Sequence, residues 1–250
     1  MSLPIAILAG GMATRLGALT EQVPKVLLEV AGRSFAAHQL ELLRRHGLER
    51  VVFCVGHLGE QVREALGDGT AWGMDLQYVF DGPRLLGTGG ALRQALPLLG
   101  EAFLVMYGDS YLECDFAAVQ RAFQASGKLG LMTVFENADH WDRSNVLFAG
   151  GRILRYDKHR PTPDMRHIDY GLGGLHAQVL DAYPAGVWLD LAAVYQALVA
   201  RGQLAGYEVA QRFYEIGSPA GLEETRRYLS NRGDAQGDLR PTVSGRSQPD

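Results

Sequence analysis

The sequence predicts an α/β fold with a mostly parallel central sheet that helices cover on both faces. Over the first half of the chain, short apolar runs typical of buried strands alternate with helical segments. This pattern favours parallel strands joined by helices. The first run leads straight into a pair of glycines, where the backbone can turn sharply. With 250 residues, 47% of them hydrophobic, the chain is long enough to bury a substantial core.

The first expected element is a buried strand over Pro4 to Leu8, which enters the turn Leu8-Ala9-Gly10-Gly11-Met12-Ala13-Thr14-Arg15-Leu16-Gly17. Glycines in such a turn let backbone N–H groups approach an anion with no Cβ in the way. Arg15 offers a forked guanidinium to phosphate oxygens, and Lys25, directly after Pro24, offers a compact ammonium. The turn therefore predicts a binding site for a polyphosphate.

Strands and helices are expected to follow in turn up to residue 135. Ser34 is the predicted N-cap of a helix that ends at Gly47, and Asp115 caps another with Phe116, Val119 and Phe123 on one face. The other expected elements are an apolar segment at Val26 to Val30, strands at Val51 to Val55, Leu76 to Phe80, Ala102 to Tyr107 and Leu129 to Phe135, and helices at Gly59 to Leu66 and Gly87 to about Leu99.

From residue 136 the pattern changes. Asn145 to Phe148 and Arg152 to Tyr156 flank Gly150-Gly151 as the two arms of a β-hairpin would. The remaining elements are a glycine-interrupted strand at Arg166 to Leu175, helices at Gln178 to Tyr183 and Leu189 to Ala200, strands at Tyr207 to Val209 and Arg212 to Ile216, and a last helix with Ser218 as N-cap, Pro219 at its first position and an end near Leu229.

These elements predict one domain over residues 1–229, in which residues 136–175 form an insertion or lid. Residues 230–250 contain almost no apolar side chains and are rich in Gly, Asp, Arg, Ser and Pro. Such a segment cannot bury enough apolar surface to fold by itself, so a disordered tail is expected.

Composition excludes several classes of protein. The formal net charge of -4 and the pI near 6.0 show no basic field of the kind that nucleic-acid binders use. No apolar stretch reaches the roughly 18 residues of a membrane span, and no signal peptide is recognisable. A cytoplasmic protein with no nucleic-acid or membrane partner is expected, and a homodimer is a possible assembly. Neither the cysteines nor the histidines show metal-ligand spacing.

Candidate functional residues follow the ends of expected strands. In open α/β sheets, ligands bind beyond the carboxyl ends of the strands, so the opening turn, the turn at Gly87 to Ala91 and the pair Gly108-Asp109 should converge. Asp109 is either a Mg²⁺ ligand or the cap of a turn. Glu215 also stands at a strand end, where it is either a second metal ligand or a solvated charge.

Two further groups have both a functional and a structural interpretation. In the functional interpretation of Gly87-Thr88-Gly89-Gly90, backbone groups and the Thr88 hydroxyl contact the edge of a nucleotide base. In the structural interpretation, the glycines only supply the flexible backbone that the start of a helix needs. Lys158 lies in a basic cluster at Arg155 to Pro161, and such clusters are usually solvated. Because Lys158 stands at the end of an expected strand, it is also a candidate for binding the phosphate of a second substrate.

The motifs resemble those of the sugar-1-phosphate nucleotidylyltransferases over about residues 3–229. The motifs that carry the resemblance are Leu8-Ala9-Gly10-Gly11-x-x-Thr14-Arg15-Leu16 with Pro24-Lys25, then Gly87-Thr88-Gly89-Gly90-Ala91, Gly108-Asp109, Asp157-Lys158 and Glu215-Ile216-Gly217-Ser218-Pro219. Within the family, the chain is most similar to the short enzymes that activate heptose, mannose or N-acetylmuramate 1-phosphates, among them guanylyltransferases and uridylyltransferases.

The resemblance implies a Rossmann-like nucleotidyltransferase fold with a small β-rich sugar-binding insertion. It also implies a Mg²⁺-dependent in-line displacement, in which a sugar 1-phosphate attacks the α-phosphorus of a nucleoside triphosphate. The products would be a nucleotide sugar and pyrophosphate. Catalysis of this kind consists of positioning and charge stabilisation. The preferred substrate pair is GTP with a manno-configured heptose or hexose 1-phosphate.

The resemblance also implies a role for each matching residue. Arg15 and Lys25 are the implied catalytic residues, and Asp109 and Glu215 the implied Mg²⁺ ligands. The implied nucleotide-binding residues are Leu8, Ala9, Gly10, Gly11, Thr14, Thr88 and Gly89, and the implied sugar-phosphate residues are Asn145, Asp157, Lys158 and Gly171.

The chain departs from the family pattern at three places. Glu215 stands where Asp is usual, Asp157 stands where Glu is common, and Ser144-Asn145 stands where a Tyr-Gly pair is usual. The departures at Glu215 and Ser144-Asn145 leave the metal geometry and the identity of the sugar open.

Three alternatives stand beside this hypothesis. One is uridylyl transfer to an amino-sugar 1-phosphate. Another is cytidylyl transfer to phosphocholine, which requires an aromatic cage around a quaternary ammonium, with Trp72, Trp141 and Tyr170 as candidates. The third is a non-catalytic nucleotide-sugar sensor, which would be expected to lose a residue such as Arg15 or Lys25.

Overall fold

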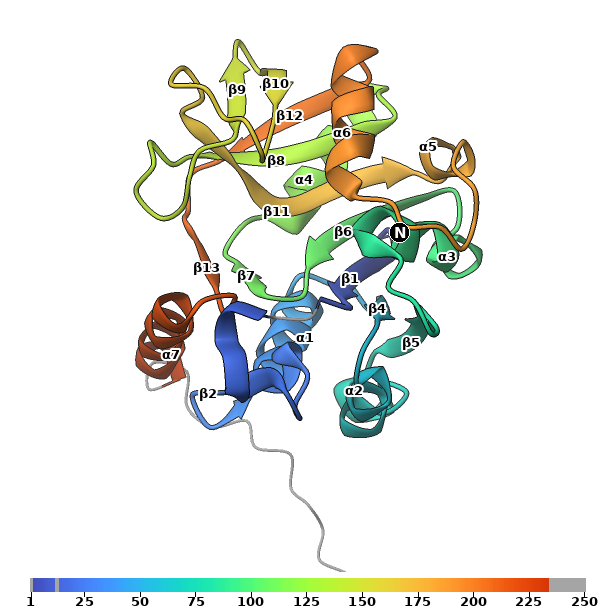
Figure 1. Ribbon diagram of the computed structural model, residues 1–250, viewed down its shortest axis with the longest axis vertical. Coiled ribbons are helices and arrows are strands. Elements are labelled where there is room, and N and C mark those ends of the chain that lie inside the picture. The colour runs from blue at the N-terminus through green and yellow to red at the C-terminus, as the bar shows by residue number, and fades with distance from the viewer. Residues whose placement is uncertain (1, 12–13, 234–250) are drawn as a thin grey trace, which may run out of the picture.

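A single large sheet forms the centre of the molecule in the computed structural model, which describes residues 2–11 and 14–233 (Figure 1). Within these residues the sheet has nine strands in the order β5-β4-β1-β6-β11-β8-β12-β10-β9. Their bounds are β1 Ile5–Ala9, β4 Arg50–Val55, β5 Asp75–Phe80, β6 Ala102–Tyr107, β8 Gly130–Glu136, β9 Val146–Ala149, β10 Arg152–Tyr156, β11 His167–His176 and β12 Leu204–Val209.

The sheet is parallel on one side and mixed on the other. Strands β5, β4, β1 and β6 are all parallel neighbours, and Ile5 of β1 lies between Val51 and Leu104. Strand β11 is antiparallel to both β6 and β8, while β12 is parallel to β8. The expected mostly parallel sheet therefore holds as far as β6. Beyond it, the hairpin of β9 and β10 must be antiparallel because its connection is too short for a crossover.

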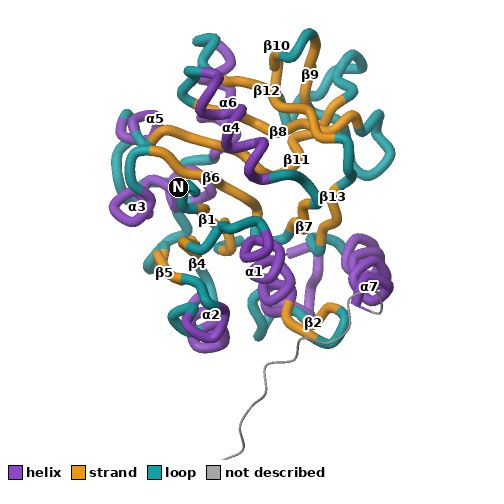
Figure 2. The backbone as a smooth tube through the Cα atoms, turned by 180° about the vertical axis from the view of Figure 1, so that it is seen from behind, coloured by secondary structure: helices purple, strands orange, loops and turns teal. Residues whose placement is uncertain are grey.

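Helices cover both faces of the sheet, as the sequence predicts (Figures 1 and 2). The helices are α1 Phe35–Arg45, α2 Gly59–Leu66, α3 Gly87–Leu99, α4 Phe116–Ser126, α5 Gln178–Asp181, α6 Leu191–Ala200 and α7 Pro219–Gly233. One core cluster joins α1, α2, α4 and α7 to Ile5 and Ile7 of β1. The other joins α3, α5 and α6 to Ala6. Alternate residues of β1 thus enter opposite cores, because side chains of a strand point to alternate faces.

Side-chain caps fix the starts of the helices near the site. Ser34 Oγ accepts a hydrogen bond from Ala37 N, and Asp115 Oδ1 accepts one from Ala118 N, so both predicted N-caps are confirmed. Asp190, which was not predicted, caps α6 by accepting from Ala192 N at 2.9 Å.

Small elements complete the region around the strand ends. They are the two-stranded sheets β2 Glu29–Val30 with β3 Arg33–Ser34 and β7 Ser110–Leu112 with β13 Phe213–Glu215, and 3₁₀ helices at Thr14–Thr20, Lys25–Leu27 and Thr70–Trp72. In the β7–β13 ladder, Glu215 pairs with Ser110, the residue after Asp109. Two residues more than a hundred positions apart in the chain are therefore neighbours.

The bounds of the predicted insertion and of the last predicted helix differ from the structure. Strand β11 lies between β6 and β8 in the middle of the sheet. The insertion expected over residues 136–175 therefore ends before His167. Helix α7 extends to Gly233, four residues beyond the predicted end near Leu229, and the rest of the predicted tail lies outside the described residues. Among those residues, no helix has the length and apolar character needed to cross a membrane.

Candidate active site

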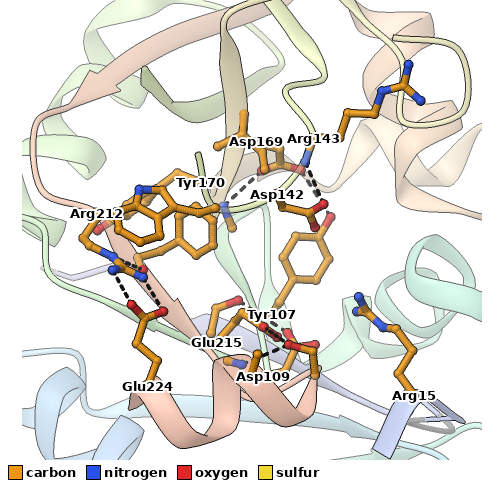
Figure 3. A pocket seen from close by; sticks show the side chains of 18 of the residues that line it. Arg15, Tyr107, Asp109, Asp142, Arg143, Asp169, Tyr170, Arg212, Glu215 and Glu224 are labelled. Carbon is orange, nitrogen blue, oxygen red and sulfur yellow. Dashed lines mark hydrogen bonds and ion pairs between the residues drawn. The ribbon is translucent and has the colours of Figure 1, made fainter. Parts of the chain in front are cut away.

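Three groups meet around Gly217, just beyond the ends of β6 and β13. A Cβ atom placed on Gly217 would lie 2.7 Å from Glu215 Oε2, 3.1 Å from Arg15 Nη2 and 3.2 Å from Asp109 Oδ2. Asp109 directly follows β6 and Gly108, and its carbonyl oxygen accepts from Ile216 N at 2.9 Å. The structure thus brings together both predicted metal ligands and one predicted catalytic arginine (Figure 3).

Lys25 is bound to the same carboxylate. Its Nζ donates to Asp109 Oδ2 at 2.7 Å, and the exposed fractions of the two side chains are only 16% and 26%. Pro24 precedes the 3₁₀ helix Lys25–Leu27, whose Val26 is buried in the core. The helix therefore holds the Lys25 backbone close to the end of β6.

Glu215 is held by the start of α7. Its carboxylate accepts from Ser218 Oγ at 2.7 Å and from the Gly217 N–H, and Ser218 Oγ in turn accepts from Gly221 N. A Cβ on Gly221 would collide with the Glu215 carboxylate. The longer side chain that replaces the usual Asp is therefore folded back onto the helix start, with Oε2 still turned toward Gly217 and Asp109.

The carboxylates can supply only part of a metal coordination shell. No group of three or more His, Cys, Asp or Glu side chains within residues 2–11 and 14–233 has a metal-binding arrangement. Two carboxylates nevertheless fit Mg²⁺, which is commonly bound by one or two carboxylates together with substrate phosphates and water.

Two cavities meet at the end of β6, since Tyr107 and Asp109 line both. The smaller cavity has a volume of about 240 Å³ and the larger about 900 Å³. Of the predicted site residues, the smaller cavity is lined by Leu8, Ala9, Gly10, Gly11, Lys25, Thr88 and Asp109, and the larger by Arg15, Asp109, Asn145, Lys158, Gly171 and Glu215. The opening turn, the Gly87 turn and Gly108-Asp109 do converge, as the strand order predicts.

The opening turn needs glycine because other backbone lies against it. A Cβ on Gly10 would lie 3.2 Å from Gly56 N. Thr14 begins the 3₁₀ helix Thr14–Thr20. The two residues before it, Met12 and Ala13, lie outside the described residues.

Thr88 and Gly89 form hydrogen bonds to the segment where α6 begins. The Thr88 hydroxyl donates to Asp190 Oδ1 at 3.1 Å and accepts from Leu191 N at 2.9 Å, and Gly89 N donates to Leu189 O at 2.8 Å. A Cβ on Gly89 would lie 2.8 Å from Leu189 Cγ. These bonds fasten the start of α3 to the start of α6, and they occupy the hydroxyl proton of Thr88 and the Gly89 N–H.

The larger cavity contains a partly buried carboxylate, Asp169, that is not among the predicted site residues. Asp169 Oδ2 accepts from Tyr156 OH at 3.2 Å and from Tyr107 OH at 3.4 Å, while Oδ1 accepts from Gly171 N at 3.1 Å. Burial raises the pKa of Asp169, and the positive charge of Lys158 opposes that rise. A carboxylate between the buried Ile168 and Tyr170 in strand β11 was the available signal.

Lys158 contacts this group of side chains through Tyr107. Its Nζ donates to Tyr107 OH at 3.2 Å and lies 5.2 Å from the centre of the Tyr107 ring. Asn145 Oδ1 accepts from Asp169 N at 3.0 Å. Gly171 has a φ of 100°, which favours glycine. Three of the four predicted sugar-phosphate residues therefore surround Asp169.

Asp157, the fourth, does not line the cavity. Its Oδ1 accepts from His159 N and Arg160 N, both at 2.9 Å, and these bonds lower its pKa. The carboxylate closes the turn after β10, which corrects the expectation that it lies around the sugar.

The aromatic side chains do not form a cage. The Arg212 guanidinium lies 3.5 Å from the centre of the Trp141 ring and donates twice to Glu224, at 2.8 and 2.9 Å (Figure 3). Trp72 donates its indole N–H to Leu66 O, and Tyr170 is 1% exposed in the core. Arg212 already covers a face of Trp141, so a quaternary ammonium has no cage to enter among these three rings.

The fold and the site define a class: an α/β protein whose two cavities meet at the carboxyl ends of its parallel strands, where such folds bind their ligands. Residues 5–144, more than half of the chain, match the family model described as nucleotidyl transferase. The chain belongs to the nucleotidyl transferase family and is an enzyme of that family, with the Rossmann-like fold that the sequence predicts.

Relatives and solved structures agree with this assignment. N-acetylmuramate alpha-1-phosphate uridylyltransferase of Neisseria meningitidis serogroup B is 30% identical over 88% of this chain and 95% of its own length. Longer curated relatives are matched over 34% to 52% of their length.

Two solved structures share the fold. A putative glucose-1-phosphate thymidylyltransferase from Bacillus anthracis superimposes with a TM-score of 0.82 at 19% identity, covering 92% of this chain and 96% of that one. HddC from Yersinia pseudotuberculosis, complexed with GMP-PN, has a TM-score of 0.74 at 18% identity, covering 91% and 99%.

Proposed function

We propose that this enzyme transfers a nucleotidyl group from a nucleoside triphosphate to a sugar 1-phosphate, releasing pyrophosphate. The observation that carries the proposal is that two cavities meet at Asp109, with Lys25 bound to that carboxylate. Two substrates that react with each other require this arrangement, since the reacting atoms must be held close together and in line. The name of the 30% identical relative supports a sugar 1-phosphate as the acceptor.

The smaller cavity is assigned to the nucleotide and the larger to the sugar phosphate. Gly10 and Gly11 line the first with backbone. Arg15 lines the larger cavity, with Nη2 3.1 Å from the position of a Cβ on Gly217, and is proposed to bind phosphate where the two cavities meet. Lys158 and Asn145 line the larger cavity and belong to the insertion that carries the β9–β10 hairpin. This insertion is proposed to bind the sugar phosphate.

The reaction is a single displacement in which the chain's own residues position and neutralise charge. A phosphate oxygen of the sugar 1-phosphate forms a bond to the α-phosphorus, and the bond from that phosphorus to the bridging oxygen breaks, so pyrophosphate leaves with the electron pair. The attacking phosphate is already ionised and needs no general base. Lys25 stabilises the charge that builds on the α-phosphate, and Lys158 orients the attacking phosphate.

Asp109 and Glu215 are proposed to hold Mg²⁺. When bound, the ion would supply positive charge that offsets the charge of the phosphate groups. Asp109 is already paired with Lys25, so the lysine ammonium is kept at the point where the α-phosphate would lie.

GTP with a manno-configured heptose or hexose 1-phosphate is the proposed substrate pair. A fold shared with a protein crystallised with GMP-PN is compatible with guanine. The second candidate is uridylyl transfer to an amino-sugar 1-phosphate, which the name of the 30% identical relative favours. Cytidylyl transfer to phosphocholine is not carried further, because the candidate rings form no cage. A non-catalytic sensor is disfavoured because Arg15, Lys25 and Asp109 are all present.

A pyrophosphate-release screen tests the proposal. Purified protein with Mg²⁺ would be given each common nucleoside triphosphate against a panel of hexose, heptose and amino-sugar 1-phosphates. One pair should release pyrophosphate, and the Asp109→Asn variant should not. The Glu64→Gln variant, which changes an exposed carboxylate on α2, should keep the full rate. Binding of nucleotide sugar with no turnover for any pair would contradict the proposal.

A further inference from the structure

Helix α1 carries a glutamine, Gln39, on the face that it buries. The Gln39 side chain is 0% exposed and lies on the same helix as the buried apolar residues Phe35, Leu40 and Leu43. An amide removed from water must recover its hydrogen bonds inside the protein, because a buried amide without partners is unfavourable. The partners of the Gln39 amide therefore indicate what this residue does.

The Gln39 amide bonds the turn that carries Asp109. Its Nε2 donates to Ser110 O at 2.8 Å and to Tyr107 O at 3.3 Å. These two carbonyl groups stand on either side of Gly108-Asp109, so the N–H bonds of one amide span the turn between β6 and β7. The opposite orientation of the amide would place its oxygen against two carbonyl oxygens, which have no proton to donate.

Backbone contacts hold the same turn against β1 and β13. Gly108 N donates to Leu8 O at 3.0 Å, and Ile216 N donates to Asp109 O at 2.9 Å. A Cβ on Gly108 would lie 2.7 Å from Leu8 O, so the turn lies directly against the end of β1. Gln39 adds support from α1. The backbone that carries the Asp109 carboxylate is thus held from three elements.

The bond to Ser110 also concerns the second carboxylate. Ser110 pairs with Glu215 in the β7–β13 ladder, and its hydroxyl donates to Asp109 Oδ1 at 3.4 Å. The Ser110 residue is only 8% exposed. A shift of the Ser110 backbone would therefore change the spacing of the Asp109 and Glu215 carboxylates.

Stability alone does not account for an amide at this position. Within the part of the chain that the structure describes, Gln39 Oε1 is buried and accepts no hydrogen bond. A buried acceptor without a partner is destabilising, and a methionine of similar length would fill the space without one. What an apolar residue could not supply is the pair of N–H bonds to the turn.

We propose that Gln39 is a positioning residue, which places Asp109, and through Ser110 also Glu215, for the binding of Mg²⁺. This inference rests on the proposed function, because that function assigns the ion to these two carboxylates. Residues that orient metal ligands without touching the ion commonly change metal affinity or activity about 10-fold to 100-fold. Asp109 also accepts from Lys25 Nζ at 2.7 Å, so a displaced Asp109 would misplace the lysine as well.

Three variants separate the N–H bonds of Gln39 from its volume. Gln39→Met keeps the length of the side chain and removes both bonds to the turn. Gln39→His restores a ring N–H that can reach the same carbonyl groups. Gln120→Met is the matched control, because Gln120 of α4 accepts from Leu3 N at 2.8 Å and lines neither cavity.

Mn²⁺ binding, followed by the electron paramagnetic resonance signal of the free ion, measures the metal site without turnover. Mn²⁺ takes the same carboxylate and water ligands as Mg²⁺. Gln39→Met should bind Mn²⁺ about 10-fold more weakly than the wild type, and Gln39→His should recover most of the loss. Its kcat should also fall about 10-fold, with the KM for the sugar phosphate within about 2-fold of wild type. Gln120→Met should keep the wild-type values.

Hydrogen exchange reports on the turn itself. In Gln39→Met, the amides of residues 107–112 and 213–217 should exchange about 3-fold to 10-fold faster, since the turn that pairs with Ile216 has lost two bonds. The amides of α4 should exchange at the wild-type rate. A thermal melt shows whether the variant is folded, and Gln39→Leu supplies a second variant without a donor.

The outcomes separate this inference from the proposed function. Wild-type Mn²⁺ affinity or unchanged exchange in a folded Gln39→Met variant would overturn it. An equal loss of affinity in Gln39→His would also do so, because volume would then matter and the donor would not. A wild-type protein that binds no Mn²⁺ would overturn the inference together with the metal assignment. Mn²⁺ binding that depends on Gln39, in a protein that releases no pyrophosphate from any substrate pair, would support the inference and contradict the proposed function.

Discussion

Lys25 Nζ and Asp109 Oδ2 are 2.7 Å apart at the point where the two cavities meet. The pair sets a cation that lines the smaller cavity beside a carboxylate that lines both cavities. Asp109 is proposed to bind Mg²⁺ as well, so the ammonium and the ion would share one carboxylate. This pairing supports the proposed catalytic role of Lys25.

Removing Lys25 should slow the chemical step. Lys25→Ala is expected to lower kcat by about 10²-fold to 10³-fold, the usual effect of deleting a group that stabilises charge in the transition state. The KM for the sugar phosphate should change much less. Lys128→Ala, which removes a lysine outside both cavities, is the control. Steady-state pyrophosphate release measures both constants, and a full rate in Lys25→Ala would refute the assigned role.

The carboxylates should determine the Mg²⁺ requirement. Asp109→Asn and Glu215→Gln are each expected to raise the Mg²⁺ concentration for half-maximal activity by about 10-fold or more, because Mg²⁺ favours charged oxygen ligands. Glu215 also accepts from Ser218 Oγ at the start of α7. Glu215→Gln should therefore lose about 1 kcal/mol of stability as well.

A magnesium titration of activity, combined with thermal melts, separates these two effects. Glu64→Gln, on exposed α2, should change neither quantity. An unaltered magnesium dependence in both site variants would show that the ion binds elsewhere.

Asp169 should govern both sugar-phosphate binding and part of the pH dependence of stability. Its raised pKa means that the folded state holds a proton more tightly than the unfolded chain does. The stabilisation of the folded state by this proton is therefore complete at a pH below the ordinary aspartate pKa of about 3.9. It is lost as the pH rises through the higher pKa of the folded state. Asp169→Asn cannot ionise and should lack this component. Its stability relative to that of the wild type should therefore be higher at pH 8 than at pH 4.

Denaturant unfolding at several pH values measures this difference. The same variant should raise the KM for the sugar phosphate by roughly 10-fold, since Asp169 holds Tyr107 OH, to which Lys158 donates. Nucleotide affinity should stay within about 2-fold of wild type. A parallel pH dependence in the two proteins would contradict a titrating Asp169.

The parts of the site that the sequence predicted are those determined by local chain direction. The opening turn follows a strand, Lys25 lies close to it in the chain, and Asp109 ends another strand, so the rule that ligands bind at strand ends was sufficient. Asp81, which lines the smaller cavity, follows β5 in the same way, and the same rule applied to the strand at Leu76 to Phe80 would have identified it.

Other contacts depend on packing between distant segments. Thr88 is bonded to Asp190 and Leu191, about a hundred residues away, and no local pattern indicates that contact. Asp157 adjoins Lys158 in the chain, yet its side chain turns to the backbone of the following residues. The place of β11 in the middle of the sheet likewise depends on its pairing with β6 and β8, not on its own sequence.

The last prediction concerns whether Thr88 binds the base or fastens α3 to α6. Thr88→Val keeps the shape of the side chain but removes the acceptor for Leu191 N and the donor to Asp190 Oδ1. Because these groups are partly buried, the variant should lose about 1–3 kcal/mol of stability. Thr88→Ser should lose less because it retains the hydroxyl. If the hydroxyl serves packing alone, the ratio of GDP to CDP affinity should be unchanged in Thr88→Val, whereas loss of a base contact would change that ratio. Denaturant unfolding and calorimetry on the same preparations decide between the two roles.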